Sequence, residues 1–146
     1  MKKILLITLL LASTSLVYAA DKQLAIAETP SVTADWIHFS GPSTAANWIH
    51  FSGPSPAATY VYTTDNCHES PIQLLDSSPT YADLIFVSGP STAADWIHLS
   101  GPSTAADWYH ITSNESIAEI KLCIPNEELR TEKNIAILLH ILQQSD

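Results

Sequence analysis

One short pattern of hydrophobic and polar positions recurs along most of the chain. Its clearest copy, at residues 92–103, reads Thr-Ala-Ala-Asp-Trp-Ile-His-Leu-Ser-Gly-Pro-Ser, and related copies cover residues 33–43, 44–55, 80–91 and 104 onward. Each copy has a small, polar start, an apolar and aromatic centre and a Ser-Gly-Pro-Ser break. The central position falls every twelve residues without a slip, at Trp36, Trp48, Tyr60, Ile72, Leu84, Trp96 and Trp108. A period this strict predicts a repeat architecture.

The centre of the repeat predicts a short strand. The copies vary at these positions almost only among aromatic and β-branched residues, which suit a pleated surface. Alternation then places Trp96 and His98 on one face of the strand. Asp95, Ile97 and Leu99 fall on the opposite face. Such strands stack as a solenoid, with the Trp residues in a ladder, or pair as a meander; the pattern alone does not choose between the two.

A helical interpretation of the repeat is the alternative. Thr-Ala-Ala-Asp at residues 92–95 matches a capping box with Asp in place of Glu, and Gly101 followed by Pro102 is a normal helix stop. The helices would have only about eight residues, which is short for an independent helix. We therefore expect a mainly β fold of short repeated strands with a C-terminal α-helix, joined by Gly-Pro-Ser-Thr type I turns. The alternative is a mainly α fold of short-helix repeats.

The segments before the repeats have their own signals. Residues 1–19 read as a secretory signal peptide, with a basic Lys2-Lys3 start, an apolar run and a small-residue cleavage site. Cleavage near Ala19 would deliver the chain to the periplasm or outside the cell. Residues 20–31 are a lead-in with a weak strand signal at Leu24 and Ile26, and residues 32–115 hold the repeats. Within the repeats, residues 71–79 are expected to be a loop or a short helix.

Residues 116–146 predict a strand and a helix that pack on the repeats. The strand covers residues 117–124, because the apolar side chains alternate cleanly there. A helix follows from about Glu127 or Glu132 to Gln143. Its apolar stripe consists of Ile135, Leu138, Leu139 and Leu142.

The composition limits the partners. The chain has 15 acidic and 6 basic residues, a net charge of −9, and no Lys or Arg between Lys22 and Lys121. Phosphate binding needs cations, so a nucleic-acid partner is not expected. No run after the signal reaches the roughly 18 apolar residues of a membrane-spanning helix. We therefore expect a protein or a glycan of the cell envelope as the partner, and self-association as a further option.

Two cysteines, Cys67 and Cys123, predict one disulfide in an exported chain. Closing a loop of this length would stabilise the fold by roughly 4 kcal/mol in the chain-entropy model. The alternative is two free or separately paired thiols.

The candidate binding residues are the aromatic and imidazole side chains that recur with the repeat. They are Trp36, Trp48, Trp96, Trp108, His38, His50, His98 and His110. Histidine is a common metal ligand, but zinc or copper binding would need a helical repeat or clustered imidazoles, so no metal or cofactor is expected. The Trp residues either form a platform for sugar rings or belong to the core. The chain contains no Gly-x-Ser-x-Gly elbow, phosphate loop or Cys-x-x-Cys motif, so we expect no catalytic residues and no enzyme.

The tail resembles a known family. From Leu122 the chain reads Leu-Cys-Ile-Pro-Asn-Glu-Glu-Leu-Arg-Thr before the final helix. This resembles the C-terminal end of small periplasmic immunity proteins that neutralise peptidoglycan-amidase effectors of type VI secretion. Thr131 comes two residues later than in that family, Cys67 is the sole candidate partner for Cys123, and the family's helical middle has no counterpart.

Two functions follow as expectations. The repeats indicate an exported, non-enzymatic protein with a binding or scaffolding role at the cell envelope. The resemblance of residues 122–146 implies the alternative, an immunity-type inhibitor of a peptidoglycan-degrading effector.

Overall fold

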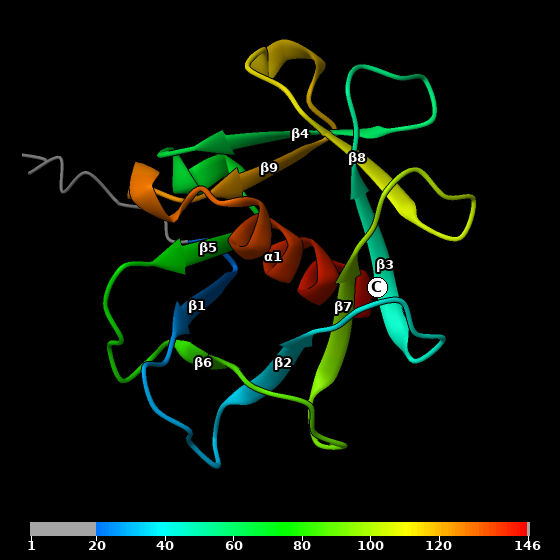
Figure 1. Ribbon diagram of the computed structural model, residues 1–146. Coiled ribbons are helices and arrows are strands. Elements are labelled where there is room, and N and C mark those ends of the chain that lie inside the picture. The colour runs from blue at the N-terminus through cyan, green and yellow to red at the C-terminus, as the bar shows by residue number, and fades with distance from the viewer. Residues whose placement is uncertain (1–19, 146) are drawn as a thin grey trace, which may run out of the picture.

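The computed structural model describes residues 20–145, so the expected signal peptide and cleavage site lie outside the described residues. Nine short strands surround one α-helix, α1 (Glu132–Gln144), in this part of the chain (Figure 1). The strands are β1 (Lys22–Ile26), β2 (Asp35–Phe39), β3 (Ala46–Phe51), β4 (Thr59–Thr64), β5 (Ile72–Leu75), β6 (Asp83–Val87), β7 (Asp95–Leu99), β8 (Asp107–Ile111) and β9 (Ile120–Cys123).

The strands form a closed barrel in which every pair is parallel. Its order is β1-β5-β9-β4-β8-β3-β7-β2-β6, and β6 pairs again with β1. Strands that follow each other in sequence are never neighbours: β7 lies between β2 and β3, and β8 lies between β3 and β4. The chain therefore goes round the barrel almost twice, and strands of the second circuit fill the gaps left by the first.

The register between neighbouring repeat strands is shifted by two residues. Ile37 of β2 lies opposite Asp95 of β7, and Ile49 of β3 lies opposite Asp107 of β8. Because side chains alternate with a period of two, an even shift keeps each residue type on the same face in neighbouring repeat strands. The expected division of faces is confirmed, since Ile97 is fully buried whereas Trp96 and His98 are only half-buried.

Short crossover loops join the strands. Each connection has six to eight residues, whereas parallel strands usually need about a dozen or more, often with a helix. Seven extended residues can span about 23 Å, which is enough to return along a five-residue strand of about 16 Å. The hydrogen-bonded turn falls two residues later than expected: Ala46 N donates to Ser43 O, so Ser-Thr-Ala-Ala makes the turn rather than Gly-Pro-Ser-Thr.

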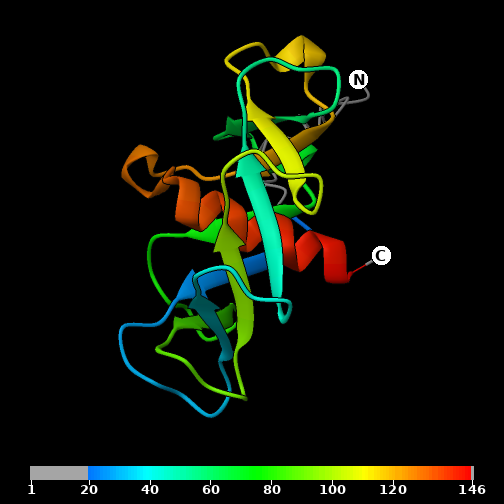
Figure 2. The same cartoon turned by 45° about the vertical axis from the view of Figure 1, so that its right-hand side comes forward.

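The helix fills the barrel. Each strand contributes inward side chains to the core, namely Leu24, Ile37, Ile49, Val61, Ile72, Leu74, Ile85, Ile97, Tyr109 and Leu122. Residues 135–141 of α1 are all buried among them, and Figure 2 shows α1 running through the ring of strands. A helix that is apolar all round is expected inside a core rather than on it. We expected α1 to pack on the repeats through one apolar stripe. The strands surround α1 instead, so its buried surface is larger than that stripe.

The twelve-residue frame extends further than expected. Leu24 of β1 and Ile120 of β9 also fall on it, twelve residues before Trp36 and after Trp108. The expectation of a loop or short helix at residues 71–79 was wrong for Ile72–Leu75, which form β5, whereas residues 76–79 lie in the loop that leads to β6. In β1, β5 and β9, which are neighbours, the inward position moves by one residue relative to the other strands. These three strands form a seam where the repeat changes phase.

The seam is closed by side chains as well as by strand pairing. Strands β5 and β9 are paired only at Gln73 and Cys123. The buried hydroxyl of Ser70 bridges them, because it accepts from Ile72 N of β5 at 3.3 Å and from Cys123 N of β9 at 2.9 Å. The predicted disulfide between Cys67 and Cys123 is confirmed and crosses the same place.

Three 3₁₀ turns lie outside the strands in the part of the chain that the structure describes. They are η1 (Cys67–Glu69), η2 (Glu115–Ile117) and η3 (Glu127–Leu129). Each follows an asparagine whose side chain accepts a hydrogen bond from the backbone two residues on, at Asn66, Asn114 and Asn126. The N-terminal end of α1 is capped in a related way, because Thr131 Oγ1 accepts from Asn134 N.

The mainly β class with a single C-terminal helix is confirmed, and the mainly α alternative is wrong. A meander is excluded because the strands are parallel, and a plain solenoid does not describe a ring that closes on itself. No helix within residues 20–145 has the length and hydropathy needed to cross a membrane.

Replacing Leu138 by Ala should destabilise the protein strongly. Leu138 of α1 is fully buried inside the barrel. Truncation of its side chain should therefore lower the free energy of unfolding by about 2–5 kcal/mol. Urea denaturation followed by Trp fluorescence measures the change. Thr44→Ala, at an exposed turn position, is the control and should stay within about 0.5 kcal/mol of wild type. An equal loss in the two variants would contradict a helix-filled barrel.

Candidate functional site

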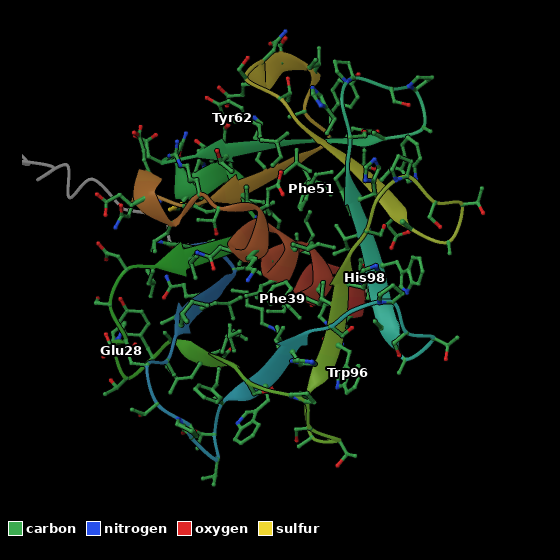
Figure 3. All side chains as sticks on the ribbon, in the orientation of Figure 1. Glu28, Phe39, Phe51, Tyr62, Trp96 and His98 are labelled. Atoms are coloured by element: carbon green, nitrogen blue, oxygen red, sulfur yellow. A yellow bond between two sulfur atoms is a disulfide. The ribbon has the colours of Figure 1, made fainter. Side chains whose placement is uncertain are left out.

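The predicted Trp and His residues lie on the outer face of the barrel. The two-residue shift places the His position of one strand opposite the Trp position of its neighbour. The rings meet edge to face, with centroids 4.8–5.0 Å apart, in the pairs His38–Trp96, His98–Trp48, His50–Trp108 and His110–Tyr60. Trp36 contacts Phe86, which occupies the His position of β6, at 5.3 Å. Figure 3 shows Trp96 and His98 at β7, with Phe39 and Phe51 turned toward α1.

Each Trp–His pair holds one crossover loop. His98 Nδ1 donates to Ser40 O at 3.0 Å, at the start of loop 40–45, and Trp48 Nε1 donates to Ser43 O at 2.8 Å, near its end. The same arrangement recurs in loops 88–94 and 100–106. These hydrogen bonds show that the loop passes over the outer face of the intervening strand.

The recurrent side chains therefore have a structural role. The structure brings Trp and His together in pairs, and each imidazole contacts an aromatic ring. Within residues 20–145, no group of three or more His, Cys, Asp or Glu side chains is placed to hold a metal ion. A binding role for the outer Trp and His residues stays a prediction.

A second cluster lies at the rim, where α1 ends beside the first residues of β3 and β7. His140 Nε2 is 3.2 Å from Asp95 Oδ2, and Gln144 Nε2 donates to the same oxygen at 2.8 Å. Asn47 Nδ2 is 3.1 Å from His140 Nδ1 and 2.7 Å from Gln143 Oε1. With the amide in this orientation, Nδ1 accepts from Asn47 and Nε2–H donates to Asp95, so both ring nitrogens of His140 are engaged.

The cluster continues to β8. Gln143 Nε2 donates to Asp107 Oδ2 at 3.0 Å and to the Tyr109 hydroxyl at 2.5 Å. Burial raises the pKa of Tyr109 above its ordinary value, although the hydrogen bond from Gln143 opposes this. The hydrogen bond from Gln144, followed by that from His140, lowers the pKa of Asp95. Asp95 is therefore a carboxylate at neutral pH, and Tyr109 keeps its proton.

Open pockets recur along this rim between paired strands. The first, about 640 Å³, lies between β3 and β7, and the second, about 490 Å³, lies between β4 and β8. Asp95 and Trp96 line the first, and Asp107 and Trp108 line the second. Further pockets lie at the starts of β5 and β9 and of β1 and β6. The repeat thus generates a recess lined by Asp and Trp twice, and the other two pockets have different linings.

Sequence reasoning missed the residues of α1 that reach the rim. His140, Gln143 and Gln144 lie 34 to 96 residues from their partners, so no local pattern connects them. One signal was available: His140 interrupts an otherwise apolar run, and a buried polar side chain needs a hydrogen-bond partner.

Comparison of the chain with protein-family models, with curated proteins and with solved structures found no match. The resemblance of residues 122–146 to immunity proteins therefore stays a prediction, and the function has to be inferred from the residues of this chain.

Replacing His98 by Phe should remove the hydrogen bond to loop 40–45 but keep the ring contact with Trp48. Phe86 makes the equivalent ring contact with Trp36 in the wild-type protein. Loss of the hydrogen bond to Ser40 should cost about 0.5–1.5 kcal/mol, measured by urea denaturation. His98→Ala removes the ring as well and should cost more. A Phe variant as stable as wild type would show that the hydrogen bond contributes nothing.

The lowered pKa of Asp95 should make stability fall in acid. A carboxyl whose pKa is lower in the folded state stabilises above its unfolded pKa of about 4, and this contribution is lost as pH falls through the folded value. Because the Asp95 side chain is half exposed, we expect less than about 1 kcal/mol. Urea denaturation from neutral to acidic pH should give a flatter profile for Asp95→Asn.

Asp35→Asn is the control for the loss of one charge at the same strand position, since the Asp35 carboxylate makes no hydrogen bond within residues 20–145. An acid profile for Asp95→Asn identical to that of Asp35→Asn would argue against the lowered pKa of Asp95.

Proposed function

We propose that this is an exported, non-enzymatic binding or scaffolding protein of the cell envelope, and that it presents repeated recesses on a rigid barrel. The observation that carries the proposal is the recurrence of similar pockets at equivalent places along the rim. Copies of one recess on one scaffold favour binding of a repetitive or extended partner, because linked sites raise the effective concentration.

The rigidity of the scaffold also supports a binding role. The helix fills the barrel and the outer rings hold the loops, so the rim is built on strand ends rather than on free segments. A site on rigid elements loses little conformational entropy when a partner binds. The disulfide is compatible with a location outside the cytoplasm.

The alternative is an immunity-type inhibitor of a peptidoglycan-degrading effector. What favours it is the order of residues in the tail: the segment from Cys123 passes through the short turn η3 and enters α1 at the Thr131 cap, which is the order that the resemblance implies although Thr131 comes two residues later. Because residues 135–141 are buried, such an inhibitor would contact its effector through the barrel surface rather than through the face of α1.

Affinity capture tests the proposal. The immobilised, oxidised protein is exposed to periplasmic extract, culture medium and isolated envelope glycan of the producing organism, and retained material is identified. We expect an envelope protein or glycan to be retained by the folded protein and not by a heat-unfolded control. Retention of a single peptidoglycan hydrolase, with loss of its activity, would support the inhibitor instead. No retained partner and no self-association would contradict a binding role.

A further inference from the structure

We propose that the pockets between β3 and β7 and between β4 and β8 bind one chain of a neutral oligosaccharide. This inference rests on the proposed binding function and names its ligand class. Both pockets are larger than a single side chain and fall within the range of about 300–1,000 Å³ that is usual for ligand sites. They are open recesses, as binding along an extended chain would require.

The two pockets share one wall, because β7 and β8 are copies of one repeat. Asp95 and Trp96 line the first, and Asp107 and Trp108 occupy the same positions in the second. The other walls differ: Asn47, His140 and Gln144 line the first pocket only. The indole N–H groups are already used, donating to the Ser91 and Ser103 carbonyls at 3.1 and 2.9 Å. Each pocket is therefore lined by both an apolar indole surface and a carboxylate.

The polar atoms left for a ligand are mainly acceptors. Asp95 Oδ1, Asn47 Oδ1 and the Thr92 hydroxyl make no hydrogen bond within residues 20–145, and all three residues line the first pocket. In the second pocket, Asp107 Oδ1 and the Thr104 hydroxyl likewise make no hydrogen bond within residues 20–145. Such a site selects a ligand rich in O–H or N–H donors.

The charge and the apolar lining narrow the class further. No Lys or Arg lines either pocket, so a phosphorylated or carboxylated sugar would meet carboxylates without a cation. A bare cation would satisfy the carboxylates but would leave the indole and alanine surfaces unused. A pyranose ring presents hydroxyl groups at its edge and C–H groups on its faces. Neutral hexoses and N-acetylhexosamines therefore match both halves of each pocket.

The separation of the pockets favours a chain over single sugars. In the barrel order β4-β8-β3-β7, the two pockets are two strand spacings apart, and the two-residue shift at each step offsets their equivalent residues by four residues along the strands. The pockets are therefore about 10 Å apart across the strands and about 13 Å along them, or about 16 Å in all. An extended tri- or tetrasaccharide is of comparable length, so one β-linked chain can reach both pockets. Two occupied pockets should then bind more tightly than either alone.

Calorimetric titration of the oxidised protein tests this inference. The probes are chitotetraose, cellotetraose, free N-acetylglucosamine, tetragalacturonate as an anionic sugar and hexalysine as a cationic peptide. We expect at least one neutral tetramer to bind, and the monosaccharide and tetragalacturonate to bind at least roughly tenfold more weakly. Ala45→Trp and Ala57→Trp fill the first and second pocket from exposed turn positions. Each should weaken tetramer binding about tenfold, and the double variant should abolish it.

Ala93→Trp is the matched control, because Ala93 occupies the same turn position as Ala45 but lines neither pocket. It should bind as wild type does, and circular dichroism confirms that all variants are folded. Absence of binding by both neutral tetramers, unchanged affinity in the double variant, or binding of hexalysine alone would each overturn the inference. If affinity capture still recovers a partner in those cases, the binding function stands without the saccharide.

Discussion

The two-residue shift between neighbouring strands is the constraint on which the other features of this barrel depend. It brings His98 beside Trp48 and His50 beside Trp108, and these pairs hold the loops that take the place of crossover helices. A shift of one residue would turn the indoles into the core and the isoleucines into solvent. The repeat therefore encodes a register as well as a strand, since each copy carries both partners of the outer contact.

The C-terminal helix is the other half of the core. Barrels of about eight strands can be filled by their own side chains, and wider ones leave space inside. Here most of the nine strands contribute one buried inward side chain each, usually an aliphatic one, and α1 occupies the remaining interior. Its last residues then emerge among the acidic strand starts, where His140 and Gln143 satisfy groups of β3, β7 and β8. The rim chemistry is thus a consequence of how the interior is filled.

The sequence was sufficient to predict the faces of the repeat strands and the disulfide, but not to predict which strands pair with each other. Alternation identified the faces of β7. The presence of two cysteines, in a chain that was expected to be exported, identified the disulfide. Both predictions depend only on a short-range pattern or on a residue count. The copies are nearly identical, so nothing in them shows that His38 meets Ser88, fifty residues away, rather than an equivalent serine. Ile72 was assigned to a loop or a short helix because its neighbours have lost the repeat residues, although its place in the frame was kept. The rim cluster was missed because α1 was expected outside the strands.

The path of the chain round the ring has a numerical consequence. Each connection advances the chain by two places, so a ring with an odd number of places is filled completely only on the second circuit. In a ring with an even number of strand positions, a chain that advances by two positions per connection would return to positions that are already occupied. Every second position would then stay empty. Gain or loss of one twelve-residue unit would break this parity, whereas a pair of units would preserve it. An open solenoid can grow by single units, but this architecture restricts tandem duplication to even steps.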